Sequence, residues 1–409
     1  MSTRNDDFRW RSIVVPALLP TLLFTTAEGA IIPLIPALAN QVGANLAIAG
    51  LVAAMLLVGY LVGDIPAGWV VARLGERNAM LGALLIGGAG LALAAFAPNA
   101  PLLGLAIGLI GVAAAVFGLA RHSLVTVVVP RVYRARALST LGGSYRLGHV
   151  IGPFLSASIL AVSGGITGVF WLCLGLLVLV AASLILLPDP ERVLRAQRAE
   201  SLPVVAPLDV FRTIHAQRGP LARLGSAGLV VSAVRATRQV LIPLWAVSIG
   251  LDEARTALII GIAALVDFLL FYPGGWLMDR YGLIVTSVPP MIGMGAAFLV
   301  LALSEGAGDP VAWFTGVTFA FALAHGLSSG ILMTMGSNLA GRRNPAPFLG
   351  AWRLVLDGGR AGAPLVVSAV TAAFGLAAAS ATIGVVALVG AGLLAWFIPR
   401  EEGLHRRRG

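Results

Sequence analysis

The sequence predicts an all-α polytopic membrane protein with twelve transmembrane helices in two pseudo-symmetric six-helix bundles. Of its 409 residues, 58% are hydrophobic and 11% are charged, whereas soluble domains carry roughly 25% charged residues. The apolar residues form blocks of about twenty or more, which is long enough to cross a bilayer core of about 30 Å. Such blocks must be helical in lipid, because a helix pairs its backbone groups within one segment.

The apolar blocks define the expected spans in chain order. They cover residues 12–38, 46–71, 78–97, 102–129, 137–162, 166–188, 222–248, 255–278, 284–303, 310–338, 348–374 and 377–398. A Pro- and Arg-containing polar stretch separates the sixth span from the seventh, and we expect a short surface helix at 206–217 within it. The predicted organisation is an N-terminal six-helix bundle (1–188), a cytoplasmic linker (189–220) and a C-terminal six-helix bundle (221–409).

The placement of arginine predicts the orientation. The chain carries a net charge of +10, with Arg as its basic residue and no Lys. The Arg residues gather at the termini, in the linker and in every second loop, whereas the other loops hold Arg255 beside several acids. By the positive-inside rule both termini are cytoplasmic, in a multi-pass protein of the cell membrane. This placement argues against nucleic acid as a partner.

The first apolar run is too long for a signal-peptide core and is expected to be retained. The single cysteine, Cys173, excludes a disulfide framework.

A short turn occurs twice, about half a chain apart. Residues 66–77 read PAGWVVARLGER and residues 273–282 read PGGWLMDRYG. The halves repeat elsewhere too: Ile32-Pro33-Leu34 matches Ile242-Pro243-Leu244, and Tyr145-Arg146-Leu147 matches Trp352-Arg353-Leu354. Two parallel repeats of six helices are typical of transporters.

These turns resemble the signature Gly-x-x-x-Asp-Arg-x-Gly-Arg-Arg of the major facilitator superfamily. The first copy has Gly68, Ala72, Arg73, Gly75, Glu76 and Arg77, and the second has Gly275, Asp279, Arg280 and Gly282. The chain looks like the twelve-helix drug/proton antiporter-like members. Only the second copy keeps the signature Asp, since Ala72 replaces it in the first.

The resemblance implies a cytoplasmic gate. Asp279 would contact the start of span five near residue 137, and Asp64 would substitute for the missing acid by pairing with Arg353 or Arg360. The expected gate residues are Asp64, Gly68, Arg73, Gly75, Arg77, Arg146, Gly275, Asp279, Arg280, Gly282, Arg353, Asp357 and Arg360. The alternative is that the arginines only orient the chain and the glycines only form turns.

Ionisable residues within the spans mark the candidate site, because charge at bilayer depth is costly and usually functional. Spans 3, 6, 9 and 12 contain no charge or His, as expected of helices facing lipid, and every other span contains at least one. The expected substrate cavity comprises Thr25, Glu28, Tyr60, Arg121, His122, Arg235, Arg238 and His325.

Glu28 and Asp267 are the candidates for proton coupling. A carboxylate withdrawn from water protonates more easily, and a nearby arginine opposes this, so moving the arginine or replacing it by substrate captures or releases a proton. The alternative for Glu28 is a static ion pair with Arg238 or Arg121. Asp267 fits either role. A lone histidine such as His149 or His325 is more often a packing residue, although it suits a proton relay.

Two further patterns bear on the substrate and on the direction of transport. Arg121, Arg235 and Arg238 lie deep in their spans, and guanidinium groups match carboxylate or phosphate, so they favour an anionic substrate. The alternative is that these arginines pair with Glu28, Asp267 and backbone carbonyls. Gly148, Gly152 and Pro153 resemble part of the antiporter signature of family exporters and predict a helix-bending motif, with helix packing as the alternative.

The sequence therefore favours a secondary active transporter that works by alternating access. Proton-coupled efflux of small amphipathic or drug-like molecules is the first expectation, a transporter of a small organic anion the second, and a non-transporting receptor or scaffold the third. The chain has no nucleotide-binding GxxxxGK[ST] pattern and no metal-ligand or nucleophile constellation, so neither an enzyme nor a cofactor is expected. The expected partners are a small-molecule substrate, protons and membrane lipids, for a monomeric protein.

Overall fold

The computed structural model describes residues 10–129, 133–186, 219, 221–339 and 346–406. Regular structure in this part of the chain is entirely helical, as predicted. The first half contains α1 (Trp10–Ile31), η1 (Ile32–Leu34), α2 (Ile35–Gln41), α3 (Leu46–Leu74), α4 (Glu76–Ala95), α5 (Ala100–Val128), α6 (Arg134–Ser163) and α7 (Thr167–Leu186). The second half contains η2 (Leu221–Gly225), α11 (Ser226–Ser248), α12 (Glu253–Leu303), α13 (Pro310–Leu327), α14 (Ile331–Leu339), α15 (Ala346–Phe374) and α16 (Leu376–Arg406).

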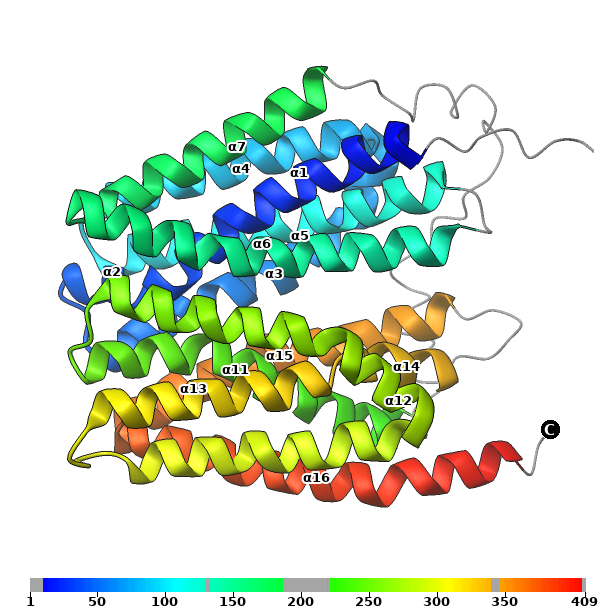
Figure 1. Ribbon diagram of the computed structural model, residues 1–409. Coiled ribbons are helices and arrows are strands. Elements are labelled where there is room, and N and C mark those ends of the chain that lie inside the picture. The colour runs from blue at the N-terminus through cyan, green and yellow to red at the C-terminus, as the bar shows by residue number, and fades with distance from the viewer. Residues whose placement is uncertain (1–9, 130–132, 187–218, 220, 340–345, 407–409) are drawn as a thin grey trace, which may run out of the picture.

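Helix α12 contains two of the predicted spans. Its 51 residues correspond to about 77 Å of straight helix at a rise of 1.5 Å per residue, more than twice the thickness of a bilayer core. The backbone at Gly282 is not helical (φ 83°, ψ 178°). The predicted spans 255–278 and 284–303 lie on either side of this residue, and Figure 1 shows the two parts of α12 running antiparallel.

Ten helices among the described residues are long and apolar enough to cross a membrane. Helix α12 counts once among them although it folds back on itself. Helix α15 is not among them, since Arg353, Asp357 and Arg360 reduce its apolar character. The twelve crossings expected from the sequence therefore stay a prediction, and so do the boundaries of the two bundles.

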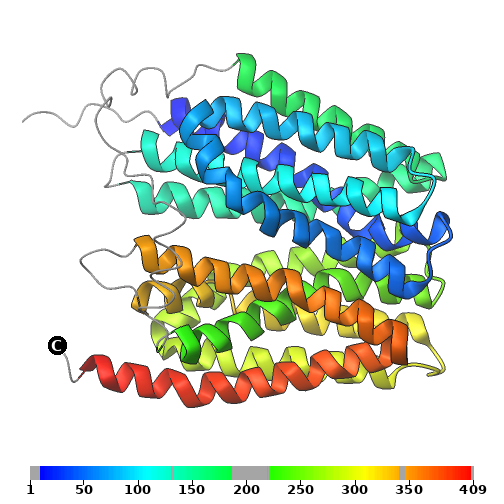
Figure 2. The ribbon, with the colours of Figure 1, turned by 180° about the vertical axis from the view of Figure 1, so that it is seen from behind.

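The helices form two groups, α1–α7 and α11–α16, which lie side by side in both views (Figures 1 and 2). Helix α3 packs against α15 and α6 packs against α12 across the interface, and α11 also contacts α2 and α3 there. The start of α1, the end of α7 and the end of α16 lie at one end of the molecule (Figure 1), the end that the sequence assigns to the cytoplasm. The linker predicted at 189–220 lies outside the described residues except for Gly219, as does the surface helix predicted at 206–217.

The repeated turn has the same backbone conformation in both halves. Gly75 and Gly282 both have a φ of 83°, a conformation that side-chain-bearing residues rarely adopt. Gly75 follows the last residue of α3, and Gly282 marks the bend of α12. The sequence repeat therefore corresponds to a structural repeat, with glycine required at the same place in each copy.

The four spans without charged residues present large apolar side chains to the surroundings, as their composition predicted. Leu85 of α4 is 77% exposed, Val178 of α7 is 67% exposed and Val389 of α16 is 57% exposed. Ile292, in the second part of α12, is also exposed. In a membrane protein such surfaces face lipid, and the charged helices are left to form the interior.

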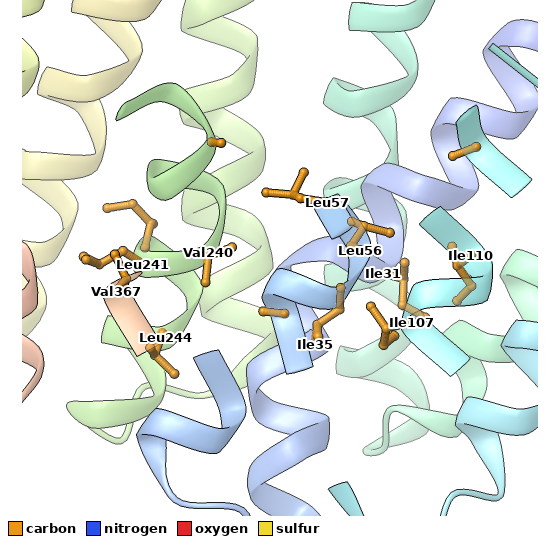
Figure 3. Close-up of a cluster of buried hydrophobic side chains, with 14 of the residues drawn as sticks. Ile31, Ile35, Leu56, Leu57, Ile107, Ile110, Val240, Leu241, Leu244 and Val367 are labelled. Carbon is orange, nitrogen blue, oxygen red and sulfur yellow. The ribbon is translucent and has the colours of Figure 1, made fainter. Parts of the chain in front are cut away.

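Buried apolar side chains from both groups form one core. Figure 3 shows Ile31, Ile35, Leu56, Leu57, Ile107 and Ile110 from the first group and Val240, Leu241, Leu244 and Val367 from the second. Close helix contacts use small residues. A Cβ atom added to Gly63 of α3 would lie 2.9 Å from Ala115 and Val112 of α5. This packing fixes the rotation of each helix and so determines which polar side chains face the centre.

Candidate functional site

Glu28 lies in the interior of the first group, and its side chain is paired with a tyrosine. The residue is 5% exposed, and its Oε1 accepts a hydrogen bond from the hydroxyl of Tyr60 on α3. Its second oxygen, Oε2, makes no hydrogen bond with the described residues. His149 Nε2 of α6 lies 3.9 Å from Oε2. Glu28 therefore has one buried carboxylate oxygen without a hydrogen bond from the described residues.

Two arginines and two aromatic rings surround this carboxylate. The guanidinium carbon of Arg360, on α15, lies 4.6 Å from the centre of the Tyr60 ring. The guanidinium carbon of Arg121, on α5, lies 5.5 Å from the centre of the Tyr145 ring. Tyr145 also contacts His149, with 4.5 Å between the ring centres. We call the six residues Glu28, Tyr60, Arg121, Tyr145, His149 and Arg360 the Glu28 cluster. Arg360 is its member from the second group.

Asp267 on α12 is the centre of a second cluster. Its Oδ2 lies 2.7 Å from His325 Nδ1 of α13 and 3.4 Å from Arg238 Nη2 of α11. Arg146 Nη1 of α6 lies 3.6 Å from Oδ1, and its guanidinium carbon lies 4.4 Å from the centre of the Phe271 ring. Asp267 is 7% exposed, so this is a buried ion-pair network to which the first group contributes one arginine.

The tenth span is interrupted beside Asp267. The sequence predicted it as one uninterrupted span at 310–338 and missed this break. Helix α13 ends at Leu327, and α14 starts at Ile331. Arg235 of α11 donates hydrogen bonds to the backbone oxygen and the Oγ of Ser328, at 2.6 and 2.7 Å. Arg146 Nη2 donates to Ser329 Oγ at 2.7 Å. These arginines thus provide hydrogen-bond partners for polar groups that the break leaves without helical partners inside the bundle. We call Asp267, Arg146, Arg235, Arg238, His325, Ser328 and Ser329 the Asp267 cluster.

The structure selects among the ion pairs that the sequence left open. Glu28 was expected to pair with Arg238 or Arg121 if its role were static. Among the described residues Arg238 pairs with Asp267 instead, and Arg121 contacts the Tyr145 ring. The sequence could not distinguish these because the rotation of each helix decides which charge faces which.

Two residues expected in the cavity make no hydrogen bond or ion pair with the Glu28 cluster in the described part of the chain. Thr25 is 1% exposed, and its hydroxyl donates to the backbone oxygen of Thr21 at 2.8 Å. It packs against Gly148 in the contact between α1 and α6. The side chain of His122 is exposed on α5 and makes no hydrogen bond or ion pair with the described residues. The structure therefore places neither side chain within the Glu28 cluster.

A third cluster joins the two groups through α3 and α15. Arg353 Nη2 on α15 lies 2.9 Å from Asp64 Oδ1 on α3, which is one of the two pairs that the sequence predicted for Asp64. Arg353 Nε also lies 3.5 Å from Asp357 Oδ2, one helical turn along α15. The Arg353 side chain is 56% exposed. A gating role for this contact stays a prediction.

The signature turns make contacts within their own halves. The guanidinium carbon of Arg73 lies 5.2 Å from the centre of the Trp69 ring, and that of Arg280 lies 5.5 Å from the centre of the Trp276 ring. Asp279 is exposed, and no hydrogen bond or ion pair joins it to the start of α6 within the residues that the structure describes. The expected contact of Asp279 with the start of α6 stays a prediction.

The remaining signature residues differ in their roles. Arg77 Nη2 donates to the backbone oxygen of Ile185 at 2.9 Å, which ties α4 to the end of α7. Glu76 is buried, and its Oε1 accepts a hydrogen bond from Ser123 Oγ of α5 at 2.8 Å, a contact that sequence reasoning missed. A Cβ atom added to Gly68 or Gly275 would meet nothing within 4 Å, so close packing does not require glycine there.

The glycines of the partial antiporter signature pack α6 against α1. A Cβ atom on Gly152 would lie 2.5 Å from Ala30 N and Thr26 O, and Gly148 faces Thr25 in the same contact. Pro153 lies against the second group, 3.3 Å from the position that a Cβ atom on Gly261 would take. The packing alternative therefore has direct contacts, and helix bending at this motif stays a prediction.

A small pocket lies between the two groups where η1 and α2 approach α11 and α12, at the end opposite the signature turns. It has a volume of about 240 Å³. The repeat-related prolines Pro33 and Pro243 line it together with Asn40, Asp252 and Thr256. No group of three or more His, Cys, Asp or Glu side chains able to hold a metal ion occurs in the described part of the chain.

Comparison with known families and proteins agrees with this architecture. A family model described as the Major Facilitator Superfamily matches residues 17–364. A curated relative described as probable anion transporter 6 of Oryza sativa subsp. japonica is 31% identical over 143 residues. That match covers 33% of this chain and 33% of the relative, so the chain spans about a third of this relative's length.

Solved structures resemble the whole molecule. A POT family transporter crystallised in complex with 5-aminolevulinic acid has a TM-score of 0.76 and 14% identity, with 96% of both chains covered. A D-xylose-proton symporter has a TM-score of 0.71 and 16% identity, with 96% of this chain and 99% of the other covered. At these identities the likeness shows a shared fold.

Proposed function

The chain belongs to the Major Facilitator Superfamily, and we propose that it is a proton-coupled transporter of a small organic anion. Its family and its fold indicate a multi-pass membrane transporter. The substrate and the coupling ion are our proposal, and both derive from the two buried clusters. Transport would proceed by alternating access between the two groups of helices.

An excess of positive charge in the centre carries the proposal. The Glu28 and Asp267 clusters together hold the carboxylates of Glu28 and Asp267 and five guanidinium groups. These belong to Arg121, Arg146, Arg235, Arg238 and Arg360. Adding Asp64, Asp357 and Arg353 of the third cluster still leaves more arginines than acids. Uncompensated charge is costly at bilayer depth, and an anionic substrate would neutralise part of it.

The two central acids have different surroundings, which supports assigning the proton to Glu28. Asp267 is held by Arg146, Arg238 and His325, and these partners offset the cost of its buried charge. No arginine lies within ion-pair distance of Glu28 in the described residues, and its Oε2 has no hydrogen bond there. We therefore propose Glu28 as the proton carrier and Asp267 as the centre of an ion-pair network between the groups.

The relative described as a probable anion transporter adds support from its name, although it matches only a third of this chain. Efflux of drug-like molecules, the first expectation from the sequence, is the second candidate. The observation in its favour is the Gly148–Pro153 segment, which contacts both α1 and α12. The rings of Tyr60, Tyr145 and Phe271, which could hold an aromatic cation, are already in contact with arginines.

We further propose that the protein acts as a monomer in the cell membrane, surrounded by lipids, with both termini in the cytoplasm. The ends of α1, α7 and α16 at one end of the molecule agree with this orientation (Figure 1). The proposed units are residues 1–188, 189–220 and 221–409.

Transport by the purified protein in proteoliposomes tests the function. Radiolabelled lactate, benzoate and citrate are compared with ethidium and tetraphenylphosphonium while a pH gradient is imposed. We expect proton-driven accumulation of at least one carboxylate and none of the cations. Movement of the cations alone would support drug efflux instead. If no compound crosses, the receptor or scaffold hypothesis gains ground.

A further inference from the structure

The five central arginines differ in how many of their N–H donors are already used. Arg235 donates two hydrogen bonds to Ser328. Arg146 donates to Ser329 and lies beside Asp267, and Arg238 also pairs with Asp267. These three arginines already bind either the serines at the break in span ten or the neighbouring Asp267. A substrate could bind them only by breaking that network.

Arg121 and Arg360 have no such acceptors. Each contacts the face of a tyrosine ring, and neither makes a hydrogen bond or ion pair with the residues that the structure describes. Asp357 lies one turn before Arg360 but is held by Arg353. A guanidinium group over an aromatic ring keeps its in-plane N–H groups for another partner, and its fork matches a carboxylate.

The two free arginines come from opposite groups and act on the same residues. Arg121 belongs to α5 and Arg360 to α15. Both lie within electrostatic range of Glu28, Tyr60 and Tyr145. The Glu28 cluster therefore contains two unpaired guanidinium groups and one carboxylate, and its net positive charge lies at the interface between the groups.

We propose that the carboxylate of the substrate binds between Arg121 and Arg360, beside Glu28. This inference rests on the proposed function and names the subsite within it. The hydroxyls of Tyr60 and Tyr145 belong to the same cluster and flank the subsite. A ligand held by one arginine from each group also joins the two groups, which is a direct way for the substrate to promote closure.

The position of Glu28 predicts how the substrate and the proton are coupled. A bound carboxylate beside Glu28 adds a second negative charge, and neighbouring like charges favour protonation of one of them. The substrate anion and the proton therefore bind together rather than in exchange. For a monocarboxylate the loaded cluster has the same net charge as the empty one, and the two cross the membrane in the same direction.

Binding to the purified protein tests the subsite without requiring transport. Lactate, benzoate and citrate are titrated by calorimetry, with lactamide and benzamide as uncharged analogues. Charged hydrogen bonds of this kind contribute about 1.5–3 kcal/mol, so Arg121→Gln and Arg360→Gln should each weaken the best-bound acid about 10- to 100-fold. Arg255→Gln, which removes an exposed arginine of the α12 start, is the matched control and should bind as the wild type does.

Lysine variants separate binding from folding. Arg121→Lys and Arg360→Lys keep the charge but lose the two-pronged donor, so we expect folded protein with clearly weaker binding of the acid. A pH dye should report uptake of about one proton per carboxylate bound near neutral pH, and Glu28→Gln should abolish that uptake while retaining binding. Proton release on binding would overturn the predicted co-binding.

Failure of the subsite differs from failure of the function. If a carboxylate binds and is transported equally well by the Arg121 and Arg360 variants, the subsite is wrong and the proposed function stands. If no carboxylate binds the wild type, both fail. Loss of binding in these variants with normal thermal stability supports the subsite.

Discussion

The hydroxyl of Tyr60 on α3 donates a hydrogen bond to Glu28 Oε1 on α1. The second carboxylate oxygen, Oε2, is buried without a hydrogen bond from the described residues, and His149 Nε2 lies 3.9 Å from it. The ring of Tyr60 also contacts the guanidinium group of Arg360 from the opposite group. Tyr60 therefore lies between the proposed proton carrier and an arginine of the other half.

Replacing Tyr60 with Phe should slow proton-driven transport. The variant removes the hydroxyl that donates to Glu28 Oε1 and keeps the ring that contacts Arg360. A charge-assisted hydrogen bond contributes about 1.5–3 kcal/mol, so we expect the rate of proton-driven carboxylate uptake in proteoliposomes to fall about 10- to 100-fold. A wild-type rate in Tyr60→Phe would show that this hydrogen bond has no part in transport.

The two central acids should differ in their importance for stability. Asp267→Asn leaves Arg146 and Arg238 without their acid in a buried site, and breaking a buried ion pair costs about 3–5 kcal/mol. Glu28→Gln removes no ion pair with an arginine and can keep a hydrogen bond from Tyr60. Thermal unfolding in detergent should show a large loss of stability for Asp267→Asn and a small one for Glu28→Gln. Equal losses would argue that Glu28 is also structural.

The contact between Asp64 and Arg353 should control the conformational step. Asp64→Asn or Arg353→Gln removes an ion pair between the groups, which for a partly exposed pair is worth up to about 1 kcal/mol. We expect each single variant to alter the turnover rate several-fold and the charge-reversed pair, Asp64→Arg with Arg353→Asp, to recover it in part. Glu305→Gln, which removes an exposed acid outside this cluster, is the control. No recovery in the reversed pair would mean that the contact does not control turnover.

Glycine at position 152 should be required for the packing of α1 and α6. A Cβ atom there would lie 2.5 Å from backbone atoms of Thr26 and Ala30, and such overpacking costs about 1–3 kcal/mol. Gly142→Ala lies in the same helix, where an added Cβ atom meets nothing within 4 Å, and should be neutral or slightly stabilising. Fluorescence-detected size-exclusion chromatography after heating compares the two. If the two variants were equally stable, α1 and α6 would be able to move apart around an added Cβ atom at little cost.

The sequence predicted the membrane fold and most of the polar interior for a clear physical reason. A charged residue within an apolar run stands out whatever its neighbours are, so Glu28, Asp267 and Arg238 could be named without a structure. The repeated turn predicted a shared backbone conformation, which Gly75 and Gly282 confirm with the same φ. The pair of Asp64 with Arg353 was predictable because the sequence places both residues toward the same end of their spans.

The sequence could not predict which side chains pair with each other where the pairing depends on how each helix is rotated about its axis. Arg238 faces Asp267 rather than Glu28, and Thr25 points into a helix contact although its neighbours in sequence suggested the cavity. The break at Ser328 was also missed, because the apolar run continues on both sides. Its signal was the Ser-Ser-Gly sequence at 328–330, in which Gly330 has a φ of 81°.

The proposed role of Glu28 is to carry the proton that is transported with an organic anion. Proton-driven accumulation and carboxylate exchange without a gradient are measured for wild type and Glu28→Gln in the same proteoliposomes. We expect Glu28→Gln to retain exchange and to lose accumulation. Accumulation by Glu28→Gln at the wild-type rate would contradict it.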